Sequence, residues 1–155
     1  MSKKMAIIAT KGTLDMAYPP FILASTAAAL GYDVQIFFTF YGLQLLRKDL
    51  SDVKISPLAN PAMPMPVPMP VFMQAMPGME SMATSMMKKK LAKHGVASLE
   101  ELREMCLDMD VKFIACQMTV DLFEFDKKEF IEPVEYGGAS MFFGFAGETD
   151  ICLFV

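Results

Sequence analysis

Short, continuous apolar runs recur along the chain and alternate with segments that carry a helical pattern. Runs that are continuous, rather than alternating with polar residues, are typical of strands buried on both faces of a parallel sheet. The clear runs are Met5–Thr10, Val34–Phe40, Val111–Cys116 and Asp150–Val155, with Lys54–Leu58 as a weaker fifth candidate. The pattern therefore predicts a mostly parallel sheet of about five strands.

The segments between these runs predict helices that cover the sheet. Phe21–Leu30 is rich in alanine and is followed by a glycine, which is common just after a helix. Ser98 and Glu101 stand at capping-box spacing ahead of apolar residues in helical register, and Gly137–Ala146 leads into the last run. Strands and helices that alternate in this way imply right-handed crossovers. We expect an α/β fold in which residues 1–155 form a single three-layer α/β/α domain.

Residues 57–87 break this alternation and form a Met/Pro-rich insertion. They contain seven of the ten prolines and nine of the sixteen methionines. Proline removes a backbone donor and clashes with the preceding turn, so the proline-rich part, 57–78, is not expected to be a regular helix. From about Met79 the pattern becomes helical as far as Lys88–Lys90.

The charge and the cysteine content exclude several classes of protein. The chain has 14 Lys and Arg against 18 Asp and Glu, a net charge of −4, which disfavours nucleic acid as a partner. Three cysteines and one histidine are too few for a zinc finger or a four-cysteine cluster, and no nucleotide-binding motif is present. We therefore expect no metal site and no bound cofactor. The odd number of cysteines, and a first apolar run too short for a signal peptide, indicate a reducing, cytoplasmic compartment.

The apolar content is high for one small domain. Hydrophobic residues make up 54 % of the chain, and the mean hydropathy is +0.35. An excess of apolar side chains predicts burial between subunits, and hence a homo-oligomer. The methionines of residues 57–87 suit such a contact surface, since methionine fills irregular apolar gaps. Two less favoured interpretations stay open: copper(I) binding by thioethers such as Met63 and Met65, and shallow contact with a membrane, although the prolines argue against a spanning helix.

Cys116 is the most informative single residue. It ends the third apolar run, and Gln117–Phe123 has the pattern of a helix start. In open α/β sheets ligands bind at the carboxyl ends of the strands. The amides at a helix start also favour a thiolate, which is the nucleophile of sulfur chemistry. The alternative is a small apolar side chain packed at a strand end.

Other candidate residues accompany Cys116 with weaker signals. Cys106 lies in the capped helix, where a packed core thiol is favoured over a second, resolving thiol. Cys152 stands in the last strand and is expected to pack in the core. Lys11, Gly12 and Thr13 follow the first strand at the same edge as Cys116 and could hold a small oxyanion. Gln117, directly after Cys116, is a further candidate for binding the same group.

Several segments, spread over nearly the whole chain, form a recognisable combination. They are Met5–Thr10, Val34–Gly42, the Met/Pro-rich insertion, Phe113–Asp121, and Tyr136–Gly138 with the apolar terminal strand. The most specific part is Phe113–Asp121 together with the insertion. This combination resembles the DsrE/DsrF-like family, and within it the larger branch labelled peroxiredoxin-like.

The resemblance implies a sulfur-trafficking protein. Family members carry sulfane sulfur as a persulfide, or a thiosulfonate group, on a cysteine after the fourth strand, and Cys116 matches that position. Cys106 matches a second cysteine that is common upstream in this branch. The resemblance also implies homo- or hetero-oligomers, and small partner proteins of the TusA and rhodanese kinds.

The favoured function is therefore a sulfur carrier or sulfurtransferase that works by thiol exchange at Cys116. The alternative, from a different class, is a non-catalytic oligomeric binding or assembly module that uses the Met-rich surface of residues 57–87. Peroxidase activity is disfavoured, because Phe113 stands where a Thr-x-x-Cys pattern would need threonine.

Overall fold

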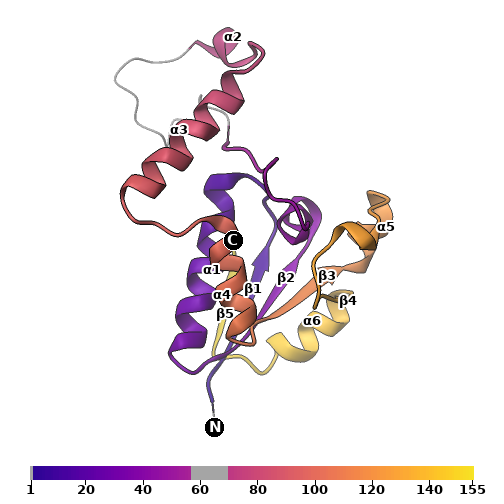
Figure 1. Ribbon diagram of the computed structural model, residues 1–155. Helices are drawn as coiled ribbons and strands as arrows, with labels where there is room; N and C mark the ends of the chain where they lie inside the picture. Colours follow the sequence, from indigo (N-terminus) through magenta and orange to yellow (C-terminus); the bar gives the residue numbers. More distant parts are fainter. Residues whose placement is uncertain (1, 57–69) are drawn as a thin grey trace.

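The computed structural model describes residues 2–56 and 70–155 and is built around one sheet. Five strands lie in the order β4-β3-β2-β1-β5, and every neighbouring pair is parallel (Figure 1). The strands are β1 (Lys4–Ala9), β2 (Asp33–Phe38), β3 (Lys112–Cys116), β4 (Glu135–Gly137) and β5 (Ile151–Phe154). The predicted α/β fold with a parallel sheet is confirmed.

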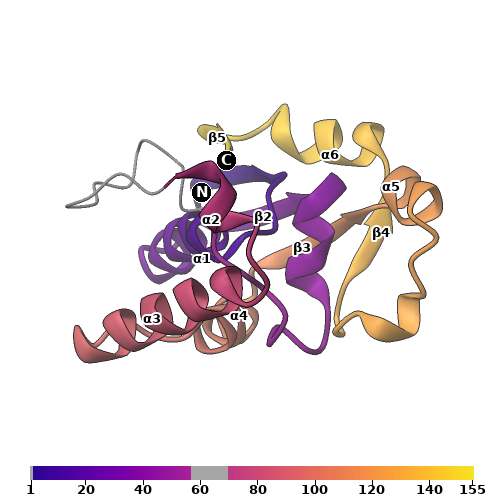
Figure 2. The same cartoon turned by 90° about the horizontal axis from the view of Figure 1, so that it is seen from above.

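Helices connect these strands and cover the sheet. They are α1 (Leu14–Ala29), α2 (Val71–Gln74), α3 (Met79–Lys93), α4 (Leu99–Asp108), α5 (Gln117–Leu122) and α6 (Ala139–Ala146), with the 3-10 helices η1 (Phe40–Leu46) and η2 (Lys127–Glu129). Helices α1 and α4 pack together on one side of the sheet, and α6 lies on the other (Figure 2). Parallel strands are stable in this setting because helices bury both of their faces.

The core is divided by the sheet into two clusters. Side chains alternate along each strand, so that Ile36 and Phe113 face α1 and α4, whereas Phe37 and Ile114 face α6. The first cluster is large and also includes the buried leucines of η1, while the second is small and centred on Phe142 of α6. The small cluster is the one that contains Cys116.

The fifth strand is not where the sequence pattern placed it. Of the expected strand Lys54–Leu58, residues 54–56 form no strand, and 57–58 lie outside the described residues. The backbone there bonds to helices instead: Lys54 O accepts from Leu14 N, and Ile55 N donates to the hydroxyl of Thr84. The fifth strand is β4, a three-residue segment too short to produce an apolar run.

Helix α1 begins earlier than the alanine-rich segment Phe21–Leu30. It starts at Leu14 and contains Pro19 and Pro20, each of which removes a backbone donor. Tertiary packing outweighs this loss, since Leu14, Ala17, Pro20 and Phe21 are all buried. Sequence signals for a helix boundary were therefore misleading at the two prolines.

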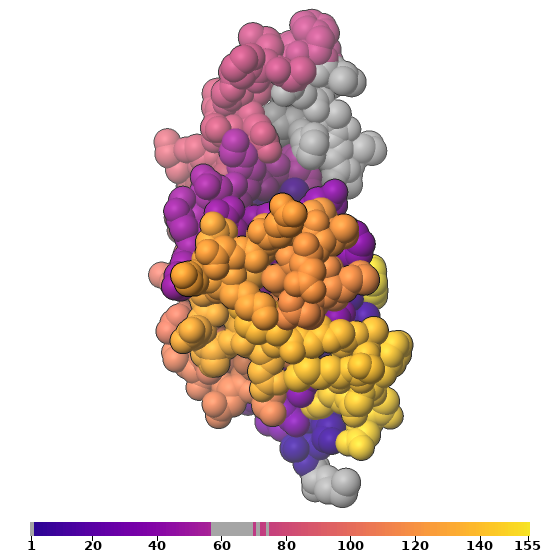
Figure 3. Space-filling view, turned by 90° about the vertical axis from the view of Figure 1, so that its right-hand side faces the viewer, coloured from indigo at the N-terminus to yellow at the C-terminus, as the bar shows by residue number. Residues whose placement is uncertain are grey.

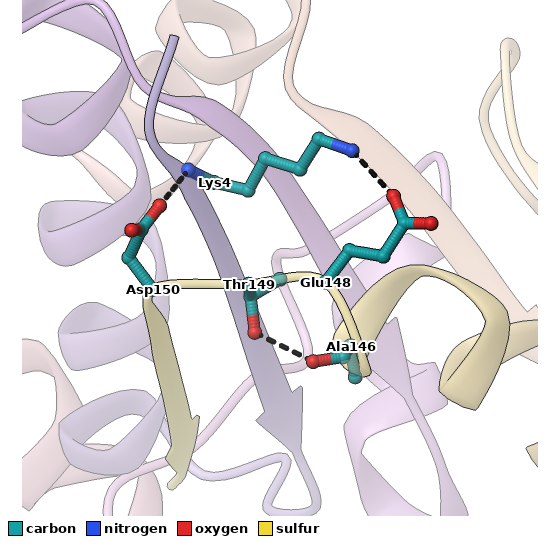
Figure 4. A network of polar contacts seen from close by, with 5 residues as sticks. All are labelled: Lys4, Ala146, Glu148, Thr149 and Asp150. Carbon is teal, nitrogen blue, oxygen red and sulfur yellow. Dashed lines mark hydrogen bonds and ion pairs between the residues drawn. The ribbon is translucent and has the colours of Figure 1, made fainter. Parts of the chain in front are cut away.

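Lys4 joins the beginning of β1 to the turn that precedes β5 (Figure 4). Its backbone amide donates to Asp150 Oδ2 at 2.8 Å, and its ammonium group donates to Glu148 Oε2 at 2.8 Å. The hydroxyl of Thr149 donates to Ala146 O at 2.8 Å and closes the end of α6. These contacts fix the place where the chain enters β5.

Helices α2 and α3 form an arm that projects beyond the sheet (Figure 1). The expected helical pattern from Met79 is confirmed, and α3 ends at Lys93, just before His94 and Gly95, the latter at φ +71°. The expectation of no regular helix in 57–78 is wrong at α2, which begins directly after Pro70, where the closely spaced prolines end. Only Ala83 and Thr84 of α3 are buried. Within residues 2–56 and 70–155, no helix is both long and apolar enough to cross a membrane. The first part of the Met/Pro-rich insertion, 57–69, lies outside the described residues.

Candidate functional site

Cys116 lies at the carboxyl end of β3 and immediately before α5. Its side chain is 5 % exposed and shares a cluster with Phe37, Ile114 and Phe142 on the α6 side of the sheet. The sequence predicted this position at the junction of a strand and a helix. Ligands in sheets of this kind bind at the same edge.

Burial and neighbouring hydrogen-bond donors act in opposite directions on the pKa of the Cys116 thiol. Burial alone would raise the pKa of Cys116, but hydrogen bonds from the hydroxyl and amide of Thr119, the hydroxyl of Thr39 and the amide of Met118 outweigh it. The pKa of Cys116 is therefore lowered from its ordinary value. Such donors stabilise the charged form directly, so the geometry favours a thiolate.

Thr39 reaches Cys116 because β2 and β3 are neighbours in the sheet. It follows the last residue of β2, at the edge where β3 ends in Cys116. The Oγ1 atoms of Thr39 and Thr119 are 3.2 Å apart, and the amide of Phe40 donates to Thr119 Oγ1 at 3.3 Å. Neither threonine was predicted from the sequence. The available signals were the hydroxyl of Thr119, three residues after Cys116, and that of Thr39, directly after the apolar run of β2.

Exposed apolar side chains lie on η1 and on the segment that follows Cys116. We call them the apolar rim: Phe40, Tyr41, Met118, Leu122 and Phe123. The Phe123 ring lies 6.1 Å from that of Phe40 and 6.0 Å from that of Tyr41. In Figure 3, the segment that follows Cys116 (orange) lies beside α6 (yellow) on one face of the molecule. Exposed aromatic groups of this kind are typical of protein-binding surfaces.

Lys11, Gly12 and Thr13 lie at the same edge of the sheet and line a cavity of about 370 Å³ together with Met16, Tyr41, Gln44 and Ser56. Gly12 is required there, because a Cβ at this position would collide with the carbonyl of Tyr41. Since Tyr41 also belongs to the apolar rim, the cavity adjoins the surroundings of Cys116. Gln117 does not face it: its side-chain amide donates to Asp121 Oδ1 at 2.7 Å on the same helix.

Cys106 is on the other side of the sheet from Cys116. It is fully buried in the cluster beneath α1 and α4, and its Sγ donates to Phe21 O at 3.5 Å. Burial raises the pKa of Cys106 to about 12. The structure does not bring the two thiols together, and a resolving role for Cys106 stays a prediction.

The expectation that Cys152 packs in the core is wrong. Cys152 is exposed, because β5 is an edge strand and the cluster beneath α6 is built from β1, β2 and β3. The apolar run alone could not distinguish an edge strand from a central one.

These differences predict the order in which the thiols react with iodoacetamide at pH 7. Cys106 should be alkylated last, because a pKa of about 12 leaves roughly 10⁻⁵ of it as thiolate at pH 7, whereas Cys116, with its lowered pKa, should react far faster. Peptide mass spectrometry over time would measure each rate separately. In denaturant all three rates should converge. Labelling of native Cys106 as fast as that of Cys116 would contradict this description of the site.

The chain matches a known protein family over almost its full length. The model of the DsrE/DsrF/DrsH-like family matches residues 1–154. The chain belongs to this family. The resemblance seen in the sequence is thus confirmed.

Two relatives match the DsrE/DsrF/DrsH-like chain over almost its full length. The sulfur carrier protein DsrE2 of Allochromatium vinosum is 65 % identical over 157 residues, which cover 99 % of this chain and 98 % of that protein. The uncharacterized protein YrkE of Bacillus subtilis is 33 % identical over 166 residues, with the same coverage of each chain. The crystal structure of the ychN protein from E. coli matches with a TM-score of 0.56, full coverage of both chains and 12 % identity, which shows the fold alone.

Among residues 2–56 and 70–155, no three His, Cys, Asp or Glu side chains gather in a way that could hold a metal ion. Met63, Met65 and Met69, the candidates for copper(I), lie outside the described residues.

Proposed function

We propose that the protein is a sulfur carrier that holds sulfane sulfur, or a thiosulfonate group, on Cys116 and passes it to partner proteins. The observation that carries this proposal is a thiol of lowered pKa at the carboxyl end of β3, directly before α5. It is supported by membership of the family and by the 65 % identical relative that is named a sulfur carrier.

Loading is a thiol exchange with no net oxidation. The Cys116 thiolate attacks the outer sulfur of a polysulfide, the S–S bond breaks, and the shortened polysulfide leaves with the electron pair. With tetrathionate, the central S–S bond breaks, thiosulfate leaves, and the thiosulfonate group stays on Cys116. The donors that lower the Cys116 pKa enlarge the thiolate fraction at neutral pH.

Unloading is the same chemistry with Cys116 as the leaving group. A partner thiolate attacks the outer sulfur of the Cys116 persulfide, the S–S bond breaks, and Cys116 departs as thiolate with the electron pair. A thiol of lower pKa leaves faster, so the same hydrogen bonds assist both halves of the cycle. The chain then returns to its starting state.

The partner is proposed to dock on the apolar rim and to be a small sulfur-carrier protein of the TusA or rhodanese kind. The rim adjoins Cys116, and it offers Tyr41, Leu122 and Phe123 to a complementary apolar surface. The cavity lined by Lys11, Gly12 and Thr13 is proposed to accept the oxygen atoms of a thiosulfonate, which the ammonium group of Lys11 can bind.

We also propose that the protein is a homo-oligomer in a reducing, cytoplasmic compartment. Large apolar side chains of the α6–β5 segment are exposed, including Phe143 and Phe154, the latter at 71 %. Exposed apolar surface of this kind is usually covered by another chain. The three cysteines are free, which suits a reducing compartment.

The second candidate function, an assembly module, has one observation in its favour. The α2–α3 arm exposes Phe72, Met76, Met82 and Met86. Under this function the arm would bind a partner, and the thiol would be dispensable for binding. The loading experiment below separates the two.

The intact mass of the protein tests sulfur loading directly. After incubation with polysulfide the mass should rise by whole sulfur atoms, and after tetrathionate by one thiosulfonate group, and a reductant should reverse both. No adduct with either donor would contradict the carrier function and leave the Met-rich arm as the better site to study.

Leu122→Asp is expected to separate loading from transfer. Leu122 is an exposed residue of the apolar rim, so a carboxylate there should leave loading by polysulfide unchanged. Transfer to a TusA-type acceptor should slow by about tenfold, which corresponds to about 1.4 kcal/mol of lost docking energy. Quenched-flow mass spectrometry would follow the acceptor. Leu30→Asp, at an exposed leucine on the far end of α1, is the matched control, and equal slowing in both variants would argue against docking at the rim.

A further inference from the structure

Arg103 is a buried cation that has no acidic partner among the described residues. It lies on α4 and is 7 % exposed. Its guanidinium donates only to backbone carbonyls: Nη1 to Leu45 O at 3.0 Å and to Arg47 O at 2.6 Å, and Nη2 to Lys48 O at 3.5 Å. Glu100 and Glu104 of the same helix favour the charge from a distance, but neither forms an ion pair with it, and burial lowers the pKa of Arg103. A buried charge held only by carbonyls is costly, so a role beyond packing is expected.

The three carbonyls lie at the end of η1 and just after it. The last carbonyls of a helix have no hydrogen-bond donor within the helix. At the end of η1, Arg103 is that donor. The neighbouring carbonyl, Leu46 O, accepts from Ile131 N at 2.8 Å. This end of η1 is therefore bonded to α4 through Arg103 and to the segment before β4 through Ile131.

The other end of η1 is at Cys116. Thr39, which precedes the helix, has its Oγ1 3.2 Å from that of Thr119, and the amide of Phe40 donates to Thr119 Oγ1 at 3.3 Å. Both threonines lower the pKa of Cys116. Phe40 has a left-handed backbone at φ +49°, a conformation that a residue with a side chain adopts only when the surrounding structure imposes it. The seven residues of η1 thus connect Arg103 to the reactive thiol.

The middle of η1 cannot relax easily between these two ends. A Cβ on Gly42 would collide with the carbonyl of Ala9 at the end of β1, so the helix is seated directly on that strand. The amide of Thr39 also donates to Ala9 O at 3.1 Å. A displacement at one end of such a short, close-packed element is transmitted to the other.

We propose that Arg103 is a positioning residue for the sulfur-carrying site: it holds η1 so that Thr39 stays against Thr119, beside Cys116. The inference rests on the proposed function only in taking Cys116 as the reactive thiol. Arg103 touches neither the thiol nor its cargo. It acts through η1 and Thr39.

The test compares Arg103→Met with Arg103→Lys and measures the iodoacetamide reaction of Cys116 as a function of pH. Removal of the guanidinium should shift the profile to higher pH and slow the reaction at pH 7 by about tenfold, or one pKa unit. Lysine can satisfy one carbonyl and should restore part of the rate. Circular dichroism and thermal unfolding would establish that each variant is folded.

The decisive measurement is the same pair of variants in a Thr39→Val background. If Arg103 acts through Thr39, the Arg103 substitutions should produce no further shift there. A folded Arg103→Met protein with an unchanged profile, or an equal shift in both backgrounds, would overturn the proposal. If Arg103→Met does not fold, Arg103→Lys decides in the same way. Alkylation needs no sulfur donor, so failure of sulfur loading and failure of this inference are distinguishable.

Discussion

Cys116→Ser protein is expected to gain no reductant-sensitive mass from polysulfide or tetrathionate, whereas the unchanged protein gains it. The serine hydroxyl is not ionised at neutral pH and cannot take up a sulfane sulfur. The substitution keeps the size of the side chain and its contacts at the end of β3, so the fold should survive. The expected effect is a complete loss of loading, measured by intact mass spectrometry.

Two matched variants control this experiment. Cys106→Ser and Cys152→Ser remove the other thiols, one buried on the opposite face of the sheet and one exposed on β5. Both should load as the unchanged protein does. An adduct that persists in Cys116→Ser and disappears in Cys106→Ser would move the carrier role to Cys106 and contradict the site described above.

Thr119→Val should have the second largest effect, on the ionisation of Cys116. Thr119 is fully buried; its hydroxyl lowers the pKa of Cys116 and accepts from the amide of Phe40 at 3.3 Å. Valine keeps the shape and removes the hydroxyl. Loss of one hydrogen bond to a charged group, about 1.5 kcal/mol or more, should raise the pKa of Cys116 by about one unit and slow alkylation at pH 7 about tenfold.

The same substitution changes how stability depends on pH. The folded pKa of Cys116 lies below its ordinary value, so the thiolate contributes stability above the unfolded pKa, and this is lost as the pH falls through the folded pKa. In Thr119→Val this contribution should shrink at alkaline pH, as urea unfolding at several pH values would measure. Thr84→Val, at a buried threonine beneath the α3 arm, is the control: it should lower stability without moving the Cys116 profile. An unchanged profile in Thr119→Val would exclude its hydroxyl as a donor.

Much of the fold was predictable because long apolar runs and cap signals are local. The runs of β1, β2 and β3 and the capping box of Ser98 and Glu101 are found where the sequence placed them. β4 was not predictable, since three residues with a single apolar side chain carry no periodicity. The start of α1 was missed because packing of Leu14 overrides the prolines, which no local signal reveals.

The residues of the site also divide into those that local sequence signals predict and those that depend on tertiary structure. The position of Cys116 follows from one strand and the helix after it, both local. Thr39 and Arg103 required knowledge that β2 lies beside β3 and that α4 packs against the end of η1, which is strand order and tertiary packing. Thr119 could have been proposed from the sequence, since it stands three residues after Cys116. A hydroxyl at that spacing is, however, common in helices that have no catalytic role.

The separation of the three thiols determines how long the carrier keeps its load. Cys106 lies across the sheet from Cys116, and Cys152 is three strands away, roughly 14 Å at ordinary strand spacing. Disulfides need Cα atoms within about 7 Å, so Cys152 cannot expel the cargo by closing a ring within the subunit. On the proposed function, the dwell time of sulfur on Cys116 then depends on the concentration and fit of the partner thiol that arrives to collect it.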